Sequence, residues 1–385
     1  MTDLATTERI LADLIEFPTI SSDSNLEMID YLAHDLGVLG ARVETFQDPT
    51  GTKANLFATL GPDTDGGIVL SGHTDVVPVA GQDWSTDPFQ LVEAQDRLYG
   101  RGTCDMKGFI AACLAMARHY TSLHLTRPLH FAFTYDEEIG CIGGQALVAD
   151  LIEKGLRPAS AIIGEPTEMR VIEGHKGCKE ITTTFTGLEG HSSQPDLGVN
   201  AVEYAVRYVG ELMRIREALK ARAPDGSRFD PPHTTLQIGQ IAGGVAHNVI
   251  PGTAELAWDL RCVQPEDETY VDTAITAHVN DILLPAMKAV HPDADISMDV
   301  IGNIVGLLPA DENEARQIVS ELTGANGTDV VAFGTEAGIF QTAGIDAVVC
   351  GPGSITQAHK PDEFISRDQL SACLDMLHGL SRYIT

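Results

Sequence analysis

The chain has 385 residues, 43% apolar and 21% charged, and its 55 acidic residues outnumber its 25 basic ones to give a net charge of −30. Such a negative chain repels phosphate backbones, so we exclude nucleic-acid binding. The longest apolar run, residues 109–117, is far shorter than the roughly 20 residues that a membrane span needs. The N-terminus has no basic region followed by a long apolar stretch, so we expect no signal peptide, and the seven cysteines lack a C-x-x-C pair. We therefore expect a cytoplasmic protein with free thiols and, from its length, two domains.

The first 175 residues alternate between strand and helix patterns. An amphipathic helix is expected around residues 10–15. Short apolar runs predict strands, and 3.6-residue periodicity predicts helices, at these positions: strands 68–71, 129–135 and 161–164, helices 108–120 and 144–153. Such alternation is typical of an α/β layer built on a mostly parallel sheet.

The pattern changes near residue 177 and changes back near residue 302. In between, the order is β-α-β-β-α-β, which is typical of a ferredoxin-like α+β unit. Its expected elements are strands 180–185, 235–241, 255–261 and 296–301 and helices 200–220 and 265–290. A helix at 312–322, a strand at 347–350 and a helix at 367–383 then resume the α/β pattern. We therefore predict one α/β domain, residues 1–177 and 295–385, interrupted by an inserted domain, residues 178–294.

A histidine and two aspartates stand beside the expected elements of the α/β domain. His73 and Asp75 end the first strand, where alternate residues point to the same side, so Asp75 can orient the His73 imidazole. A lone H-x-D is also compatible with a structural histidine. Asp105 lies in a glycine-containing segment directly before a helix, where it would either bind a metal or cap the helix.

Three adjacent acids, Asp136, Glu137 and Glu138, follow the second strand. Because like charges repel, they form either a solvated loop or a cation site, in which one carboxylate holds a metal and another moves protons. Glu165 follows the third strand, and His359 lies in a glycine-rich loop after the late strand.

These side chains share one expected location. Each of His73, the acidic pair, Glu165 and His359 follows a strand of the same sheet, and ligands bind at the carboxyl ends of parallel strands. Imidazoles and carboxylates converging there form a nitrogen and oxygen ligand set that suits zinc or a similar divalent ion.

The motifs that carry these residues resemble the M20 family of metallopeptidases and aminoacylases over essentially the whole chain. They are SGHTDVVP from residue 71, GRGTCDMKG from 100, EE at 137, GEPT from 164 and the late histidine. GHSS from residue 190 and NVIP from 248 resemble motifs of the family's second domain. The resemblance implies a metallohydrolase domain with an inserted dimerisation and lid domain.

The resemblance also implies roles for individual residues. His73 and Glu165 would hold one divalent ion, Glu138 and His359 a second, and Asp105 would bridge both. The ions would be zinc, with cobalt as the other candidate. Asp75 would support His73, and Glu137 would be the general base. His191 would stabilise the oxyanion from the partner subunit of a homodimer, whereas the alternative for His191 is an exposed sheet residue.

The substrate implied by the resemblance is a small N-acyl amino acid. DWSTDPF from residue 83, FGTEA from 333 and GPGSITQAHKPDEF from 351 are most similar to the members that deacetylate N-acetylornithine in arginine synthesis. Arg261, Asn248, Gly334 and Thr335 would then hold the substrate carboxylate, whereas Arg261 could also form a surface ion pair. A succinyl-diaminopimelate desuccinylase, a general aminoacylase and a dipeptidase remain alternatives within the family, and a non-catalytic binding protein remains one outside it.

Overall fold

The computed structural model describes residues 3–385, which form two compact units. Unit 1 contains the chain up to Gly174 together with Pro309–Val330 and Thr335–Thr385. Unit 2 contains His175–Leu308 and Val331–Gly334. The predicted boundary after residue 294 is wrong, because strand β14 (Asp295–Ile304) pairs along its length with β9 (Gly177–Thr186) and so belongs to the inserted unit.

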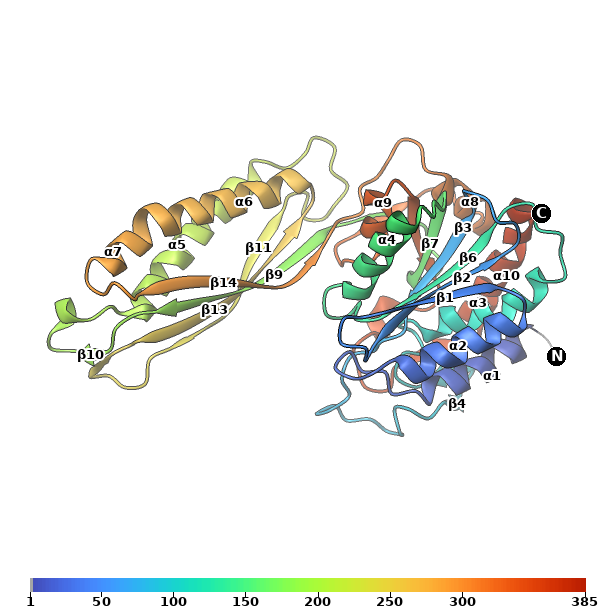
Figure 1. Cartoon of the computed structure of the whole chain (residues 1–385), viewed down its shortest axis with the longest axis horizontal. Helices are drawn as coiled ribbons and strands as arrows, with labels where there is room; N and C mark the ends of the chain where they lie inside the picture. The colour runs from blue at the N-terminus through green and yellow to red at the C-terminus, as the bar shows by residue number, and fades with distance from the viewer. Residues whose placement is uncertain (1–2) are drawn as a thin grey trace. The chain divides into compact units, whose positions relative to one another are not determined.

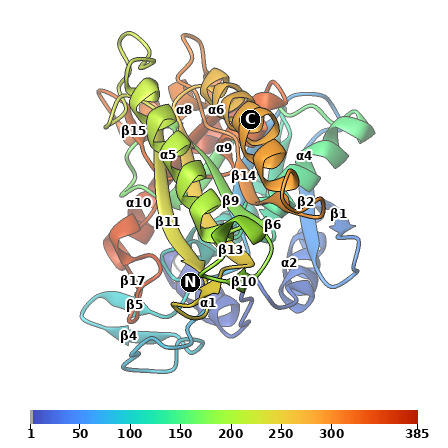
Figure 2. The ribbon, with the colours of Figure 1, turned by 90° about the vertical axis from the view of Figure 1, so that its left-hand side faces the viewer.

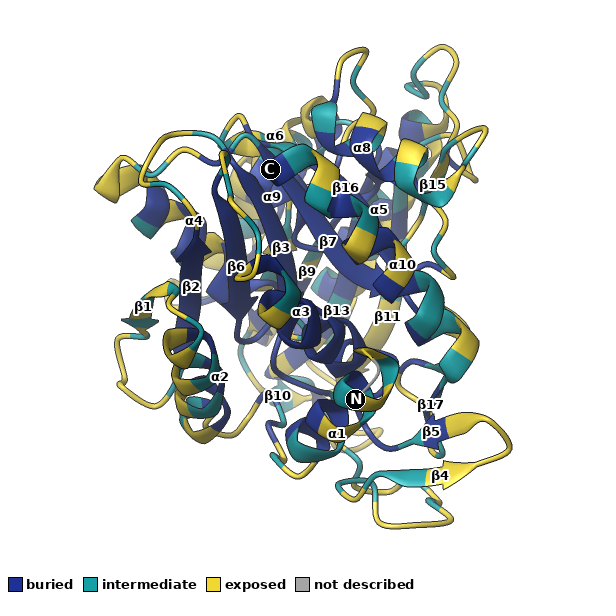
Figure 3. Ribbon diagram, turned by 90° about the vertical axis from the view of Figure 1, so that its right-hand side faces the viewer, coloured by how far each residue is buried: buried dark blue, intermediate teal, exposed yellow. Residues whose placement is uncertain are grey.

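Unit 1 is built on an eight-stranded sheet whose central strands are parallel. The order is β1-β2-β6-β3-β7-β16-β8-β15, and β6, β3, β7 and β16 are parallel neighbours. The strands are β1 (Arg42–Gln47), β2 (Ala54–Leu60), β3 (Ile68–His73), β6 (Leu129–Thr134), β7 (Ser160–Pro166), β8 (Ile172–His175), β15 (Asp329–Val331) and β16 (Asp346–Gly351). This confirms the predicted α/β class, and Figure 3 shows the central strands buried along their length.

Helices cover both faces of this sheet. The main apolar core lies on the face covered by α1 (Asp3–Ile15), α2 (Leu26–Val38), α3 (Lys107–Tyr120), α8 (Glu314–Thr323) and α10 (Arg367–Ile384). The other face is covered by α4 (Ile142–Lys154) and α9 (Ala337–Thr342). A sheet buried on both faces explains why its strands are continuous apolar runs without alternation.

A small sheet lies beside the main one. It has the order β17-β5-β4 and consists of β4 (Val92–Ala94), β5 (Arg97–Tyr99) and β17 (Phe364–Ser366). Its β5–β17 pairing joins the segment before Gly100 to the segment after Glu363, which are distant in sequence. Two loops that the sequence marked as candidate site segments are thereby brought together.

Unit 2 has the predicted β-α-β-β-α-β order. Its antiparallel sheet, β11-β13-β9-β14, has the strand order of a ferredoxin-like fold and includes β11 (Thr235–Gly243) and β13 (Thr253–Cys262). Helix α5 (Ala201–Lys220) and helix α6 (Pro265–His278), which continues through a π turn into α7 (Leu284–Lys288), lie along one face of this sheet (Figures 1 and 2). A short ribbon pairs β10 (Gly190–His191) with β12 (Val249–Ile250).

Two further expectations concern the whole chain. All seven cysteines lie within the described residues and are free, as predicted, and all of them are buried. Among residues 3–385, no helix is long and apolar enough to cross a bilayer.

Candidate metal centre

The predicted ligand residues lie at one edge of the unit 1 sheet. His73 is the last residue of β3, Glu165 lies near the end of β7, Glu137 follows β6, and His359 follows β16. Because these four strands are parallel and adjacent, their carboxyl ends meet at the same edge. The local fold therefore gathers side chains that are up to 286 residues apart in sequence, from 73 to 359.

Asp105 is at the centre of the cluster. Its Oδ1 lies 3.0 Å from His73 Nε2, and its Oδ2 lies 3.5 Å from His359 Nε2. His73 Nε2 is also 3.7 Å from Glu165 Oε1, and His359 Nε2 is 2.9 Å from Glu138 Oε2. Each oxygen of Asp105 thus faces a different imidazole, which is the arrangement expected of a carboxylate between two cation positions.

Among the described residues, two groups of side chains offer ligand atoms close enough to share an ion. One is His73, Glu137 and Glu165, and the other is His73, Asp105 and Glu138. His73, Asp105 and Glu165 are buried, and nitrogen and oxygen donors of this kind suit zinc and similar divalent ions. Several carboxylates gathered away from water need compensating positive charge, so the donor set fits a metal centre.

The pKa shifts describe the same crowding of acids. Burial, together with neighbouring carboxylates, raises the pKa of Glu137 and of Glu165 well above the usual range, against the opposing effect of His73. Burial and then Asp105 raise the pKa of Glu138. Bonds to Asp105 and Glu138 raise the pKa of His359 to about 10. The raised pKa values favour protonation of the cluster in the absence of a cation, and a divalent ion would displace such protons.

The structure decides between the alternatives for Asp105 and the acidic pair. Helix α3 begins at Lys107 with Met106 at the N-cap position and no side-chain cap bond, so Asp105 is not a cap. Glu137 and Glu138 are half-buried and lie within the cluster. Both residues thus lie where the cation-site interpretation places them.

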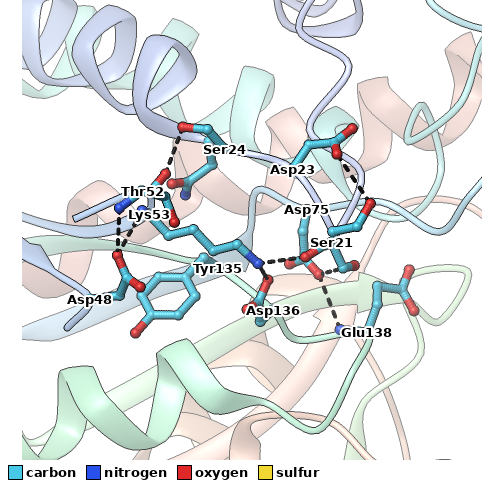
Figure 4. A network of polar contacts seen from close by, with 12 residues as sticks. Ser21, Asp23, Ser24, Asp48, Thr52, Lys53, Asp75, Tyr135, Asp136 and Glu138 are labelled. Carbon is cyan, nitrogen blue, oxygen red and sulfur yellow. Dashed lines mark hydrogen bonds and ion pairs between the residues drawn. The ribbon is translucent and has the colours of Figure 1, made fainter. Parts of the chain in front are cut away.

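Asp75 contacts His73 less directly than predicted. His73 Nδ1 lies 2.9 Å from the main-chain oxygen of Asp75 and 3.6 Å from its Oδ1. The Asp75 carboxylate accepts hydrogen bonds from Ser21 Oγ at 2.7 Å and from the backbone N–H groups of Glu137 and Glu138 at 3.1 and 3.3 Å. Asp75 thus anchors the backbone of the acidic pair as well as the imidazole, and Figure 4 shows its contacts with Ser21 and Glu138.

A lysine that sequence reasoning did not identify extends this network. Lys53 Nζ donates to Asp136 Oδ1 and to the main-chain oxygen of Ser21, each at 2.5 Å. Figure 4 shows Lys53 reaching from β2's edge towards Ser21 and Asp136. The side chains of Lys53 and Asp136 are only 13% and 9% exposed, so this ion pair is largely removed from water. Nothing in the local sequence indicates it, because its partners are 83 residues apart.

Replacing Lys53 with methionine should lower the free energy of unfolding by about 3 to 5 kcal/mol, because it leaves the buried Asp136 carboxylate without its partner. The Lys53→Met, Asp136→Asn double variant should lose less than the sum of the two single variants. Urea unfolding followed by circular dichroism measures both quantities.

Lys154→Met is the matched control, since Lys154 pairs with Glu44 while both side chains are more than 40% exposed. The Lys154→Met substitution should lower the free energy of unfolding by less than about 1 kcal/mol. Equal losses for the Lys53 and Lys154 variants would contradict the importance of the buried pair.

Of the residues expected to contact substrate, all except Thr335 belong to unit 2. In unit 2, His191 is exposed on β10, with Nδ1 2.7 Å from Ser193 Oγ, and Asn248 is also exposed. Arg261 Nε lies 2.9 Å from Asp259, and its Nη2 lies 3.6 Å from Glu180, so the ion-pair alternative for Arg261 is the state observed.

The other two expected substrate contacts are adjacent in sequence. Gly334 belongs to unit 2, whereas Thr335 belongs to unit 1. Thr335 is buried, and its hydroxyl accepts a hydrogen bond from the Ala337 N–H at 3.1 Å. The hydroxyl thus serves as an acceptor at the start of α9.

Comparison with known proteins agrees with the metal centre. Residues 69–382 match the model of peptidase family M20/M25/M40. A curated acetylornithine deacetylase of Salmonella paratyphi B is 38% identical over 359 residues, which cover 91% of each chain. A second curated acetylornithine deacetylase, from Salmonella newport, matches with the same identity and coverage.

Solved structures share the fold at lower identity. An M20 family metallo-carboxypeptidase from Sulfolobus solfataricus has a TM-score of 0.75 at 18% identity and covers 99% of both chains. A dinuclear metal-binding M20 peptidase of Bacillus subtilis has a TM-score of 0.64 at 16% identity, covering 98% of this chain and 97% of its own. With the family match spanning most of the sequence, the chain belongs to peptidase family M20/M25/M40 and is a metal-dependent amide hydrolase.

Proposed function

We propose that the protein hydrolyses N2-acetyl-L-ornithine to L-ornithine and acetate. The proposed substrate rests on the 38% identity to curated acetylornithine deacetylases over 91% of each chain. The chemistry is supported by Asp105, whose two oxygens face the two imidazoles, and by the adjacent carboxylate of Glu137.

The ligand set supports two divalent ions, zinc in the first place and cobalt as the other candidate. His73 and Glu165 would hold one ion, Glu138 and His359 the other, and Asp105 would contact both. Ions bound there lower the pKa of water and polarise an amide oxygen. The chain supplies the remaining groups for hydrolysis.

Glu137 is proposed as the general base. Its carboxylate removes a proton from the attacking water and then delivers it to the amine as the C–N bond breaks. Burial raises the pKa of Glu137 above the usual range of a carboxyl group. Asp75 fixes the Glu137 backbone through its hydrogen bond at 3.1 Å.

The substrate carboxylate is assigned to Arg261, Asn248, Gly334 and Thr335. A guanidinium fork suits a carboxylate. Since Arg261 pairs with Asp259 and Glu180, it would exchange these partners for the substrate.

A homodimer formed through unit 2 is also part of the proposal. It is supported by exposed apolar side chains on β14 and α5, namely Met298, Val300, Ile301, Val206 and Met213.

Steady-state kinetics test the proposal. N-acetylornithine should give a higher kcat/KM than N-acetylmethionine, N-succinyl-diaminopimelate or the carboxamide of N-acetylornithine. Chelation should abolish turnover, and zinc or cobalt should restore it, with two ions per chain found by elemental analysis. A higher kcat/KM for another substrate would refute the ornithine assignment and leave the metal chemistry in place. Full turnover after complete metal removal would refute the mechanism.

A further inference from the structure

A buried ion pair behind the metal centre joins two loops that carry candidate ligands. Arg101 Nη1 lies 2.6 Å from Glu363 Oε2, and the two side chains are 1% and 0% exposed. The Glu363 carboxylate also accepts hydrogen bonds from the backbone N–H groups of Gly102, Cys104 and Asp105 at 3.0, 2.9 and 3.0 Å. Both of its oxygens are therefore occupied by donors from the loop that presents Asp105.

The same pair reaches the other ligand loop. Glu363 is four residues after His359 in the chain. Arg101 Nη2 donates to Gln82 Oε1 at 2.7 Å, and Gln82 Nε2 donates to the main-chain oxygen of His359 at 2.9 Å. Arg101 Nη1 also lies 3.3 Å from the main-chain oxygen of Lys360. The guanidinium thus contacts the His359 loop on one side while Glu363 holds the Asp105 loop on the other.

The relative position of the Asp105 loop and the His359 loop determines whether both ligands can reach one ion. Asp105 Oδ2 and His359 Nε2 are 3.5 Å apart, so a small shift between their loops would separate two ligands of the same ion. Neither loop is a regular helix or strand at Asp105 or His359, so their relative position depends on the side-chain contacts between them. A buried ion pair is weak evidence that the pair exists for stability, because apolar side chains of similar volume can replace such a pair without loss of stability.

We propose that Glu363, held by Arg101, is a positioning residue that sets the spacing of Asp105 and His359 for divalent-ion binding. The inference rests on the proposed metal-dependent function, because it concerns the ligands of that site. Glu363 itself would touch neither ion nor substrate. Its carboxylate would act through the three backbone N–H groups, and Arg101 and Gln82 through the main chain around His359.

The test is metal binding by the Glu363→Gln variant of the full chain. Glutamine keeps the size of the side chain, but it loses the charge and presents one carbonyl oxygen in place of two acceptors. Changes in residues that support metal ligands cost about 10- to 100-fold in metal affinity or activity. We expect zinc affinity, measured by competition with a chromophoric chelator, to fall by about 10-fold or more. The visible absorption bands of the cobalt-loaded protein should also shift, because the ligand geometry changes.

Asp267→Asn is the matched control for loss of a buried carboxylate. Asp267 is 0% exposed and accepts hydrogen bonds from Arg222, Thr234 and Gln264. It lies in unit 2, which contributes no residue to the two ligand groups found among the described residues. This variant should lose thermal stability while keeping wild-type zinc affinity and the wild-type cobalt spectrum.

The outcomes separate the inference from the proposed function. A folded Glu363→Gln variant with zinc affinity within about twofold of wild type, and an unchanged cobalt spectrum, would overturn the positioning role. If this variant does not fold, Gln82→Ala takes its place, because it removes the link to His359 and leaves the Arg101–Glu363 pair intact. Unchanged zinc affinity and cobalt spectrum in that variant would equally overturn the proposal. Wild-type protein that binds no divalent ion would instead refute the proposed function.

Discussion

Replacing Glu137 with glutamine should reduce kcat by about 10²- to 10⁴-fold and leave two bound ions per chain, because general acid–base catalysis contributes that much to such reactions. The amide keeps the shape of the carboxylate but can neither take a proton from water nor return it to the leaving nitrogen. Glu137 is not among the five proposed ligands, which are His73, Asp105, Glu138, Glu165 and His359. Elemental analysis and steady-state kinetics on the same preparation measure both quantities.

Glu138→Gln is the informative comparison for this experiment. Glu138 lies 2.9 Å from His359 Nε2, so its loss should lower metal content as well as turnover. Excess zinc should therefore rescue part of the activity of Glu138→Gln and none of the activity of Glu137→Gln. Near-wild-type turnover by Glu137→Gln would remove this residue from the mechanism. Loss of metal from that variant would make Glu137 a ligand instead.

The location of the cluster could be predicted because it depends on local patterns. Four of the five proposed ligands, all except Asp105, follow or end a short apolar run, and such runs become parallel strands whose carboxyl ends meet. His73 and Glu165 illustrate this most directly, since they are the last and the penultimate residues of β3 and β7. The identity of the residue types then indicated a metal, and the family resemblance indicated which residues share an ion.

The contacts that hold the ligands in place could not be predicted in the same way. Lys53 meets Asp136 across 83 positions, and Arg101 meets Glu363 across 262. No spacing rule connects residues at such separations, because their proximity exists only after the sheet and its loops have formed. Arg261 is the opposite case, because its nearest ion-pair partner, Asp259, is only two residues away on the same strand.

The predicted domain boundary after residue 294 is wrong because it separates the last expected strand of unit 2 from the rest of that unit. The four-strand pattern of unit 2 was recognised, yet residue 295 was assigned to the α/β domain although the last strand begins there. An edge strand such as β14 has exposed residues at most positions, so its sequence has little apolar alternation. The expected strand 296–301 nevertheless belongs to the β-α-β-β-α-β pattern, and the pairing of β14 with β9, from Asp295 opposite Thr186 to Ile304 opposite Cys178, places the boundary beyond this strand.

His191→Ala should lower kcat by about 10²- to 10³-fold, as expected when one donor to a developing oxyanion is removed. Metal content should not change, because His191 belongs to unit 2 and all the proposed ligands belong to unit 1. His191 is exposed and its Nδ1 is engaged by Ser193, which leaves Nε2 free to meet a substrate. Ser193→Ala tests whether this contact orients the ring, and it should have a smaller effect than His191→Ala.

Mixing two inactive variants shows whether His191 acts across a dimer. A His191→Ala subunit retains Glu137 and all the proposed ligands, and a Glu137→Gln subunit retains His191. If each site takes its histidine from the partner subunit, complete exchange makes half of the dimers mixed, each with one intact site of two. Roughly one quarter of wild-type activity should then return. If each site uses its own His191, no mixed dimer contains an intact site, and activity should not return although native mass spectrometry confirms the exchange.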